Sequence, residues 1–543
     1  MFSNDKNDTS INSKSRYGDV QATQFSTVKE CKPEDVPVLI SGLRNVFRTE
    51  KTYSAEWRKK QLQSFKLMLT EKESELCQAM FQDLHKSPFE GFATELALLH
   101  HEIDHALDHL DEWMTPEKKG NSALNIPCWA TTQRDPLGVC LVLGAWNYPM
   151  QLSLAPMIGA IIGGNCVIMK PGSYACASSN ALARIIPRYL DNECIKVVEG
   201  NRHVTTALLA ERFDHIFFTG SAFVGKLVAR AAAEHLTPVV LELGGKSPCI
   251  VDKHVNIEHA AKRIVWAKFL NCGQTCVACD FMMVHADIAD KFLAAMKRVI
   301  STFYGPNAQT SKNYGRLINV QAFQRLEKLL NGDKKYIHCG GNVDASERYM
   351  EPTIIDFGTD MERFKTSDVM QDELFGPILP VIRYHDLNEQ VIEYIKELPT
   401  GKPLALYAYS NDHTFINTIK QRTTSGGLVI NDSIMHLANG DLPFGGIGAS
   451  GLGGGYHGKY SFNQFTHEKA VLEKMSVLDN LVLFKPLLDM RFPPYTSINE
   501  NVVRLFGSFW MEKIVNLPVP AARLFVKMLA VYLTMRITEY YLF

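Results

Sequence analysis

A cysteine and a glutamate in this chain stand in surroundings that suit two-step chemistry on a carbonyl carbon. Cys276 directly follows a Gly-Gln-Thr turn, downstream of an apolar, helix-like stretch at 260–270. Glu242 lies between Leu241 and Leu243, just before two glycines break the segment. A thiolate can add to a carbonyl, and a carboxylate can later activate water. The pair therefore predicts covalent catalysis in which sulfur attacks first and hydrolysis follows.

The surroundings of both side chains suggest how their acidity is tuned. Only the thiolate attacks, so we expect backbone dipoles or a cation to lower the pKa of Cys276. A carboxylate between leucines should be partly desolvated, which raises the pKa of Glu242 toward that of a useful base. The alternative for Glu242 is a surface carboxylate at a strand end, and the flanking leucines and the glycine break disfavour it.

The same cysteine also belongs to a spacing that metals use. Cys272, Cys276 and Cys279 form C-x3-C-x2-C, and three thiolates so spaced could hold an iron–sulfur cluster or zinc. The Gly-Gln-Thr turn and the separate Glu242 segment have no part in such a cluster. We therefore expect no metal here, with Cys272 and Cys279 as small residues that line the turn.

Asn147 is a candidate donor to the oxygen that becomes negatively charged when sulfur attacks a carbonyl. Its side-chain amide and the backbone N–H of Cys276 could both point at that oxygen. The alternative is that Asn147 caps a helix opened by Tyr148-Pro149. Both roles can coexist, because a cap uses the side-chain oxygen and an oxyanion uses the NH₂ group.

Taken together, several motifs resemble the aldehyde dehydrogenase superfamily. Besides the Cys276 and Glu242 segments, four runs occur in the family's order: Trp146-Asn147-Tyr148-Pro149, Phe218-Thr219-Gly220-Ser221, Glu373-Leu374-Phe375-Gly376-Pro377 and Pro443-Phe444-Gly445-Gly446. The run Tyr456-His457-Gly458-Lys459-Tyr460-Ser461-Phe462 and the pair Pro493-Pro494 resemble the class 3 branch, which includes the fatty aldehyde dehydrogenases. The resemblance extends over roughly residues 40 to 495, so it does not depend on one motif.

The resemblance implies NAD or NADP as the cofactor. Thr219, Gly220, Ser221 and Gly225 form a strand-to-helix turn, and such a turn lets backbone and helix N-terminus approach a pyrophosphate. The turn is not the G-x-G-x-x-G fingerprint, so by itself it is weak. The family pattern further implies that Lys170 lies near the adenosine ribose, that Glu373 holds the nicotinamide ribose hydroxyls, and that Phe375 packs near that ribose.

Two positions depart from the family pattern. The family often carries a glutamate three residues after the lysine, where it binds the ribose 2′-hydroxyl, whereas this chain has Ser173. Serine does not repel a 2′-phosphate, so we predict that NADP is tolerated as well as NAD. The glycine-rich run at 451–455 is one residue longer than the class 3 pattern, which leaves the geometry of that loop open.

The order of apolar segments predicts the α/β class. Helical spacing runs from Val38 to His109, and short buried-strand patterns then alternate with helices, which indicates parallel sheets covered on both faces. We expect two doubly wound domains, a Rossmann-like cofactor domain and a catalytic domain, with a small β arm for oligomerisation built from parts of 121–134 and 461–474. The expected division is 1–36, a mobile N-terminal segment; 37–245, the NAD(P)-binding domain; 246–445, the catalytic domain; 446–495, a return to the cofactor domain with the oligomerisation strand; and 496–543, an apolar tail.

The composition restricts the partners and the cellular location that can be expected. Lys and Arg total 57 and Asp and Glu total 58 without forming a stripe, so nothing points to nucleic acid. The twelve cysteines are scattered and the first fifteen residues lack an apolar core, which predicts free thiols in a reducing, intracellular compartment. The tail at 517–543 mixes aromatic and basic residues, which favours association with a membrane surface over a span. The alternative is a tail packed on protein.

These observations predict an NAD(P)-dependent enzyme that oxidises a small-molecule aldehyde to a carboxylic acid through a Cys276 thioester. Medium or long aliphatic aldehydes are favoured because a membrane-bound tail places the site near lipid; the expected location is the cytosolic face of a membrane such as the endoplasmic reticulum, and otherwise the cytoplasm. The class 3 resemblance implies a homodimer. Two other classes stay open: a CoA-acylating dehydrogenase, and a non-catalytic, membrane-tethered scaffold of the same fold.

Overall fold

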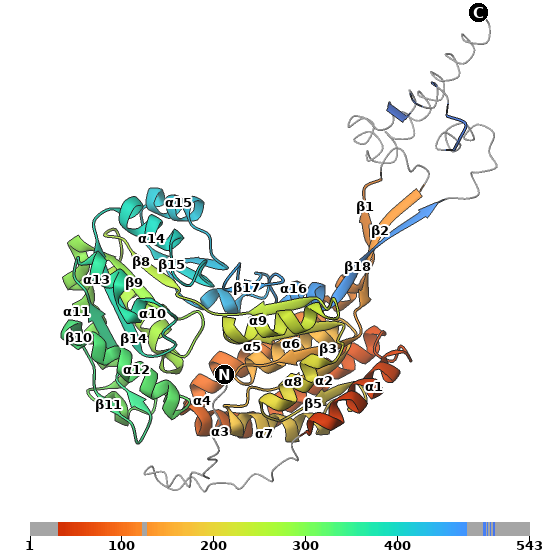
Figure 1. Cartoon of the computed structure of the whole chain (residues 1–543), viewed down its shortest axis with the longest axis horizontal. Coiled ribbons are helices and arrows are strands. Elements are labelled where there is room, and N and C mark those ends of the chain that lie inside the picture. The colour runs from red at the N-terminus through yellow and green to blue at the C-terminus, as the bar shows by residue number, and fades with distance from the viewer. Residues whose placement is uncertain are drawn as a thin grey trace, which may run out of the picture.

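The computed structural model describes residues 31–121, 128–474, 492–495, 497, 500, 503 and 504 (Figure 1). The described chain forms two lobes, each built on a largely parallel sheet with helices packed around it, and an antiparallel arm that projects from the first lobe. The predicted α/β class with two doubly wound units is confirmed.

The first lobe contains a six-stranded sheet in the order β17-β7-β6-β3-β4-β5. Its strands are β3 (Val139–Leu143), β4 (Cys166–Lys170), β5 (Ile195–Val197), β6 (His215–Thr219), β7 (Val239–Glu242) and β17 (Gly451–Leu452). All pairs are parallel except β17 with β7. Every residue of β3, β4 and β6 is buried, as expected for a parallel sheet covered on both faces.

Helices of the first lobe come mainly from the N-terminal half of the chain. They are α1 (Val36–Phe47), α2 (Ala55–Glu71), α3 (Glu73–Leu84), α4 (Pro88–Gly91), α5 (Ala97–Met114), α6 (Gln151–Ile162), α7 (Cys176–Ile185), α8 (Arg202–Ala210), α9 (Ala222–Ala233) and α16 (Gly458–Gln464). Helix α6 lies against β3 and β4 and also contacts α2, α5 and α16, which explains why all its residues are buried.

The second lobe contains a seven-stranded sheet in the order β10-β13-β14-β9-β8-β15-β16. Its strands are β8 (Pro248–Val251), β9 (Phe281–His285), β10 (Ile337–Cys339), β13 (Thr353–Asp356), β14 (Ile378–Tyr384), β15 (Ala405–Tyr409) and β16 (Gly427–Ile430), and only β10 is antiparallel to its neighbour. Its helices are α10 (Ile257–Phe269), α11 (Ala289–Tyr304), α12 (Val320–Gly332), α13 (Met361–Thr366), α14 (Glu393–Lys396) and α15 (His413–Arg422), with a small hairpin of β11 (Val343–Asp344) and β12 (Tyr349–Met350).

The chain passes between the sheets at two places. It leaves the first sheet when β7 ends at Glu242 and enters the second when β8 begins at Pro248. It leaves the second sheet after β16 and returns to the first at β17. These crossings lie close to the predicted domain limits at 245 and 445. The glycine-rich run at 451–455 begins as β17 and then turns through Gly453 and Gly454, both with positive φ.

The arm is a three-stranded antiparallel sheet in the order β1-β2-β18. Strand β2 (Cys128–Pro136) pairs along its whole length with β18 (Thr466–Lys474), and β1 (Glu117–Lys119) adds to the other edge of β2. The sequence placed 461–474 in this arm, but Ser461 lies in α16, where its hydroxyl accepts the backbone N–H of His457. The strand therefore begins five residues later than expected.

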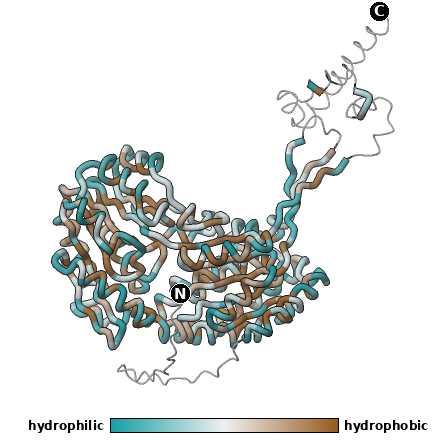
Figure 2. Tube along the Cα trace, in the orientation of Figure 1, coloured by the Kyte–Doolittle hydropathy of each residue, from teal (hydrophilic) through white to brown (hydrophobic). Residues whose placement is uncertain are grey.

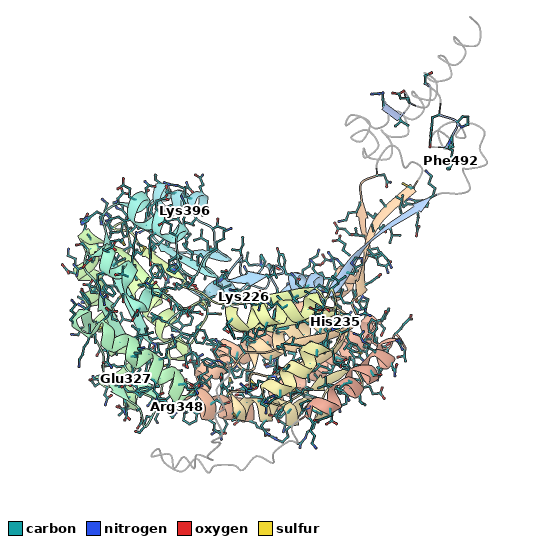
Figure 3. All side chains as sticks on the ribbon, viewed as in Figure 1. Lys226, His235, Glu327, Arg348, Lys396 and Phe492 are labelled. Carbon is teal, nitrogen blue, oxygen red and sulfur yellow. The ribbon has the colours of Figure 1, made fainter. Side chains whose placement is uncertain are left out.

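Hydrophobic residues concentrate inside both lobes, and hydrophilic residues are frequent along the outer surface and the arm (Figure 2). Long charged side chains such as Lys226 and Lys396 lie on the outside (Figure 3). Each lobe thus buries a sheet and keeps most of its charge in water.

Most of both ends of the chain lies outside the described residues. Of the segment 1–36 that was expected to be mobile, the described part includes a 3₁₀ turn at Pro33–Asp35 and the buried Val36, which opens α1. Residues 1–30 lie outside the described part. So does the tail at 496–543, apart from residues 497, 500, 503 and 504. Among the residues that the structure describes, no helix has both the length and the apolar character needed to cross a bilayer.

Candidate active site

The loop before Cys276 turns sharply where α10 ends. Asn271, Cys272 and Gly273 all have positive φ, so the backbone passes through three successive left-handed residues. A side chain at Gly273 would clash with the carbonyl oxygen of Gly376, because the two backbones are in contact there. Glycine is therefore required at this position, and the close approach joins the cysteine loop to the segment that carries Glu373.

Gln274 holds this loop through its side-chain amide. Its Nε2 donates to the carbonyls of Asn271 (3.1 Å) and Arg316 (3.0 Å), and its Oε1 accepts the backbone N–H of Ile318 at 2.9 Å. The group is fully buried, so each of these bonds replaces one that water would otherwise make. Sequence reasoning treated Gln274 only as part of a motif and missed its role in fixing the loop.

Asn147 lies directly against the loop. Its Nδ2 donates to the carbonyl of Gln274 at 3.0 Å, and its own carbonyl accepts the side-chain amide of Asn271 at 2.7 Å. One amide hydrogen of Asn147 is thus committed and the other is available to a substrate oxygen. The capping alternative is wrong: α6 begins at Gln151, and its N-cap residue is Met150.

A buried ion pair performs the capping instead. Lys86 and Glu95 are 0 % exposed and 2.5 Å apart. One Glu95 oxygen accepts the backbone N–H groups of Met150 (2.8 Å) and Gln151 (3.2 Å), which places negative charge at the start of α6. Lys86 also donates to the carbonyl of Asn147 at 2.9 Å. No motif marks this pair, since its members lie nine residues apart on different elements.

Cys276 remains partly accessible at the end of the loop. Burial of the sulfur raises the pKa of Cys276, and the nearby charges of Glu373 and Glu242 raise it further. Hydrogen bonds from the backbone N–H groups of Cys276 and Val277 act in the opposite direction but do not prevail. The expectation of a lowered pKa is therefore wrong, because desolvation outweighs the backbone dipoles.

Glu242 ends β7 and is 3 % exposed. Among the described residues neither of its carboxylate oxygens has a hydrogen-bond partner. Burial raises the pKa of Glu242 well above its ordinary value, in the direction expected from its leucine neighbours. A side-chain carbon at Gly445 would lie 3.0 Å from Glu242 Oε1, so the carboxylate rests against the glycine turn at 445–446.

The four residues expected to face a pyrophosphate lie at the junction of β6 and α9. β6 ends at Thr219, Ser221 caps α9 by accepting the backbone N–H of Val224 at 3.4 Å, and Gly220 lies between them. Gly225 packs against Leu243, where a side-chain carbon would lie 2.7 Å from that leucine. The twelve-residue helix points its N-terminus at the turn, which suits a phosphate anion.

Glu373 and Phe375 lie on the far side of the same region. A side chain at Gly244 would clash with the Glu373 carboxylate, which also accepts the backbone N–H of Gly245. Burial raises the pKa of Glu373, and the charge of Asp280 adds to the rise. The Phe375 ring meets Trp146 edge-on, with centroids 5.4 Å apart. Residues from widely separated motifs thus converge beside Glu242 and Cys276.

Comparison with known proteins identifies the family of this chain. The profile of the aldehyde dehydrogenase family matches residues 5–471. The chain belongs to the aldehyde dehydrogenase family. It is therefore an enzyme that oxidises aldehydes with NAD or NADP, and the CoA-acylating and scaffold alternatives are not favoured.

This aldehyde dehydrogenase is similar to family 3 proteins over most of its length. It is 43% identical over 464 residues to aldehyde dehydrogenase family 3 member B1 of Rattus norvegicus, which is 86% of this chain and 96% of the relative. It is 40% identical over 477 residues to aldehyde dehydrogenase family 3 comG of Dictyostelium discoideum (87% and 97%), and 40% identical over 464 residues to family 3 member A2 of Mus musculus (86% and 92%).

Solved structures agree on the fold. The substrate-bound state of Staphylococcus aureus AldH superposes with a TM-score of 0.82 at 38% identity, covering 87% of this chain and 99% of that protein. An indole-3-acetaldehyde dehydrogenase in complex with NAD+ has a TM-score of 0.73 at 23% identity over 83% of this chain and 91% of that one, so it shares the fold. The two-lobed architecture is thus that of the family.

In this aldehyde dehydrogenase, Lys170 and Ser173 meet at the end of β4. Lys170 Nζ donates to Ser173 Oγ at 3.0 Å, and Ser173 Oγ donates to the carbonyl of Gly200 at 3.0 Å. The departure from the family pattern therefore puts a neutral hydroxyl beside the lysine, where a glutamate would carry charge.

The other two cysteines of the C-x3-C-x2-C spacing have separate surroundings. Cys272 Sγ contacts the Tyr314 hydroxyl at 3.6 Å, whereas Cys279 Sγ contacts Ser433 Oγ at 3.6 Å. Within the described ranges, no group of three or more ligand side chains is arranged to hold a metal ion. Cys272 and Cys279 thus contact different parts of the interior.

Proposed function

We propose that this aldehyde dehydrogenase oxidises medium- and long-chain aliphatic aldehydes through a thioester on Cys276. The observation that carries the proposal is the pairing of a partly accessible cysteine with a desolvated, unpartnered carboxylate, Glu242, beside the fixed amide of Asn147. Burial raises the pKa of the Cys276 thiol in the free protein, so in this proposal the thiol must lose its proton before it attacks.

The residues act in sequence in this proposal. Glu242 accepts the thiol proton of Cys276 and passes it to solvent, and the sulfur adds to the aldehyde carbon, while the free amide hydrogen of Asn147 and the backbone N–H of Cys276 stabilise the oxyanion. The bound dinucleotide supplies the acceptor for the hydride that leaves this adduct. Glu242 then takes a proton from water, whose oxygen attacks the thioester and releases the carboxylic acid. Loss of one oxyanion donor typically costs about 3 kcal/mol of transition-state stabilisation.

Preference for an alkyl chain is supported by the segment next to Glu242. This segment includes Gly445, and along it Met435, Leu442 and Ile447 are exposed apolar side chains. Exposed apolar side chains on the segment that reaches Glu242 through Gly445 suit a hydrocarbon chain, whose burial contributes about 0.8 kcal/mol per CH₂.

The test is cofactor reduction with hexadecanal, hexanal and benzaldehyde, with and without CoA, in the wild type and in Cys276→Ala. We expect reduction that favours the longer aliphatic aldehyde, yields free acid with CoA present, and disappears in the variant. Formation of acyl-CoA, or activity that survives in Cys276→Ala, would reject the mechanism. A preference for benzaldehyde would reject the substrate class alone.

We also propose that NADP is accepted as well as NAD. Lys170 donates to the neutral Ser173, so a 2′-phosphate would meet a cation and a hydroxyl where the family often has a glutamate. Comparable kcat/KM with the two cofactors is the expected result. A preference for NAD beyond about a hundredfold, which corresponds to roughly 2.7 kcal/mol, would overturn it.

We also propose that the enzyme is a homodimer attached to the cytosolic face of a membrane. The β1-β2-β18 arm projects from the body and offers an edge for a second copy, which supports a homodimer. All twelve cysteines are free thiols, which supports a reducing intracellular compartment. Membrane attachment at a cytosolic face rests on the sequence of 517–543. Deleting these residues should release the enzyme from the membrane pellet, and an unchanged pellet would reject attachment through the tail.

A further inference from the structure

Glu90 is a buried carboxylate of the first lobe that reaches the cysteine loop (271–276) of the second lobe. It lies in α4 and is 8 % exposed, and its Oε1 accepts the backbone N–H of Asn271 at 2.8 Å. Asn271 stands at the start of the left-handed turn that leads to Cys276. Glu90 lies outside the motifs of the family resemblance, so this bond emerges only in the folded chain.

The cysteine loop needs an acceptor at this point because α10 has ended. The N–H of Leu270 bonds the carbonyl of Trp266, and the chain then turns so that Asn271 has a φ of 52°. The N–H of Asn271 donates to Glu90 in place of a helical carbonyl, and the residue is 1 % exposed, so bulk water does not reach it. A buried N–H left unpaired costs the full desolvation of the group. Glu90 therefore supplies an acceptor that the helix no longer offers.

Asn271 connects this bond with Asn147. Its Nδ2 donates to the carbonyl of Asn147 at 2.7 Å and to the carbonyl of Gln274 at 3.1 Å. The side-chain amide of Asn147 donates to the same Gln274 carbonyl at 3.0 Å. Two side-chain amides, one from each lobe, thus meet at the carbonyl two residues before Cys276. The position of each amide depends on the other, because they share this acceptor.

Lys86 holds the Asn147 carbonyl from the side of the first lobe. Its Nζ donates to that carbonyl at 2.9 Å, so the oxygen accepts from Lys86 and from Asn271 together. Lys86 and Glu90 are four residues apart in the sequence. One short segment of the first lobe therefore bonds both the proposed oxyanion donor and the cysteine loop.

The ion pairing of this segment separates the role of Glu90 from that of Glu95. Lys86 lies 2.5 Å from Glu95 and both are 0 % exposed, so Glu95 is the counter-ion of the lysine. Removing the Glu90 carboxylate therefore leaves Lys86 paired, whereas removing Glu95 would leave a buried cation. The contact that depends on Glu90 is the bond from the Asn271 N–H, and the oxygen of a neutral amide can accept it equally.

We propose that Glu90 is a positioning residue for aldehyde oxidation, which fixes the Asn271 N–H and thereby holds the Asn147 amide and the Cys276 sulfur in one geometry. The inference rests on the proposed functions of Asn147 and Cys276. A misplacement of reacting groups by about 1 Å can cost on the order of a hundredfold in rate. Glu90 acts through the loop and touches neither substrate nor cofactor, so its loss should slow the chemical step and leave cofactor binding unchanged.

The test compares Glu90→Ala with Glu90→Gln in the first turnover of hexanal, followed as NADH formation with enzyme in excess over aldehyde. Glu90→Ala removes the acceptor, so we expect the first-turnover rate to fall by about 10- to 100-fold while KM for NAD stays within about twofold of the wild type. Glu90→Gln keeps an oxygen within reach of the Asn271 N–H, so its rate should stay within about threefold of the wild type. Rescue by the amide assigns the effect to the acceptor.

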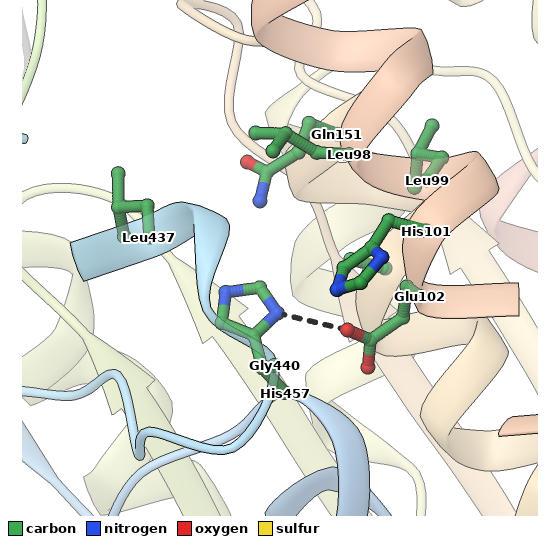
Figure 4. A pocket seen from close by; sticks show the side chains of 9 residues that line it. Leu98, Leu99, His101, Glu102, Gln151, Leu437, Gly440 and His457 are labelled. Carbon is green, nitrogen blue, oxygen red and sulfur yellow. Dashed lines mark ion pairs between the residues drawn. The ribbon is translucent and has the colours of Figure 1, made fainter. Parts of the chain in front are cut away.

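Glu102 on α5 provides a matched control. It is 5 % exposed, and its Oε1 accepts the backbone N–H of Gly458 at 2.8 Å, the same length as the bond that Glu90 makes. Its Oε2 lies 3.4 Å from His457 Nδ1, in the wall of a pocket of about 10 Å³ between α5, α6 and the segment after β16 (Figure 4). Glu102→Ala thus deletes a similar bond, but one made to α16. It should lower the melting temperature and leave the first-turnover rate within about twofold of the wild type.

A second comparison tests whether Glu90 acts through Asn271. Asn271→Gly removes the amide that bonds Asn147, and glycine still adopts the positive φ. If both residues act on the same geometry, Glu90→Ala/Asn271→Gly should be no slower than the slower single variant. Independent effects would multiply, and a multiplied loss would overturn the route through Asn271.

The remaining outcomes separate the positioning role from the proposed function. A wild-type first-turnover rate in Glu90→Ala would overturn the proposal, and so would equal losses in Glu90→Ala and Glu102→Ala, or a Glu90→Gln as slow as Glu90→Ala. If Glu90→Ala does not fold, Glu90→Met fills the same space without an oxygen acceptor and takes its place. If Cys276→Ala or Asn147→Ala forms NADH at the wild-type rate, the proposed function fails instead.

Discussion

At the scale of single residues, the two proposed catalytic groups differ from their isolated counterparts because they are desolvated. Cys276 and Glu242 both have raised pKa values, and burial is the first cause for each. In both groups burial therefore favours the neutral form over the charged one.

The first prediction concerns the nucleophile. Inactivation of cofactor-free enzyme by iodoacetamide should quicken by about tenfold per pH unit between about pH 7 and 9, because burial raises the pKa of Cys276 and the thiolate stays a minor species. Loss of activity should be followed in a Cys176→Ala background, since Cys176 is exposed and would also react. A plateau below about pH 8 would show that the thiol ionises more easily than its surroundings suggest.

The second prediction concerns the base and the pH dependence of folding. Above about pH 4.5 the unfolded chain has released the Glu242 proton that the folded protein keeps, so this group destabilises the fold increasingly as pH rises toward its folded pKa. Gln does not titrate. Glu242→Gln should therefore gain melting temperature relative to the wild type at pH 8 and little at pH 5. An equal gain at both values would argue against a raised pKa.

At the scale of elements, short segments position the catalytic side chains through contacts that no local pattern reveals. The Lys86–Glu95 pair ties the start of α6 to Asn147, and the Gly273–Gly376 contact ties the cysteine loop to the Glu373 segment. Elements of both lobes therefore have to dock correctly before the catalytic groups face one another.

Breaking the buried ion pair should be costly. Lys86→Met leaves Glu95 as an unpaired buried charge, so we expect a loss of about 3–5 kcal/mol in the free energy of unfolding. The double variant Lys86→Met/Glu95→Gln should recover part of that stability, because no buried charge remains. Its kcat should stay low, since Asn147 has lost a donor to its carbonyl. A melting temperature for Lys86→Met within a degree of the wild type would refute this account.

Substitutions at two glycines provide a matched test of whether Glu373 contributes to cofactor binding. Gly244→Ala should raise the KM for the dinucleotide by about tenfold, because the new methyl group would clash with the carboxylate of Glu373 and displace it. Gly332→Ala, at the end of α12, has no atom within 4 Å of the added carbon and should be neutral. Unchanged KM in Gly244→Ala would place Glu373 away from the cofactor.

At the scale of the whole molecule, the site exists only because the chain crosses between two sheets. Glu242 stands at the end of β7 in the first sheet, and Cys276 lies between α10 and β9 of the second lobe. The chain then returns through β17, which pairs with β7 at Glu242 itself, before α16 and the arm. Segments from both ends of the sequence thus enclose one centre.

The arm gives a prediction about assembly. Trp129 on β2 is 57 % exposed although it belongs to a fully paired strand. If the arm joins two copies, Trp129→Glu should shift the enzyme from dimer to monomer at micromolar concentration, because a charge would be buried at the contact. Sedimentation velocity reports this directly, and kcat should change little. A wild type that sediments as a monomer would exclude the dimer.

Sequence alone determined the α/β class and the alternation of strands and helices, because each depends on local pattern, and short motifs supplied the candidate site residues. The parallel strands at Val139–Leu143 and His215–Thr219 and the turn before α9 needed nothing more. Sequence-based prediction failed where the structure depends on contacts between distant segments. Asn147 does not cap α6, because Glu95 from another helix does so.

Only the tertiary structure decided the electrostatics. The sequence around Cys276 suggested backbone dipoles that lower its pKa, yet the fold brings the charges of Glu373 and Glu242 near the sulfur and removes water from it. The pocket at His457 could not be read from the chain either, since its walls lie more than three hundred residues apart in sequence. Motifs specify which groups are present, whereas packing fixes their distances and their access to water, and those two quantities set reactivity.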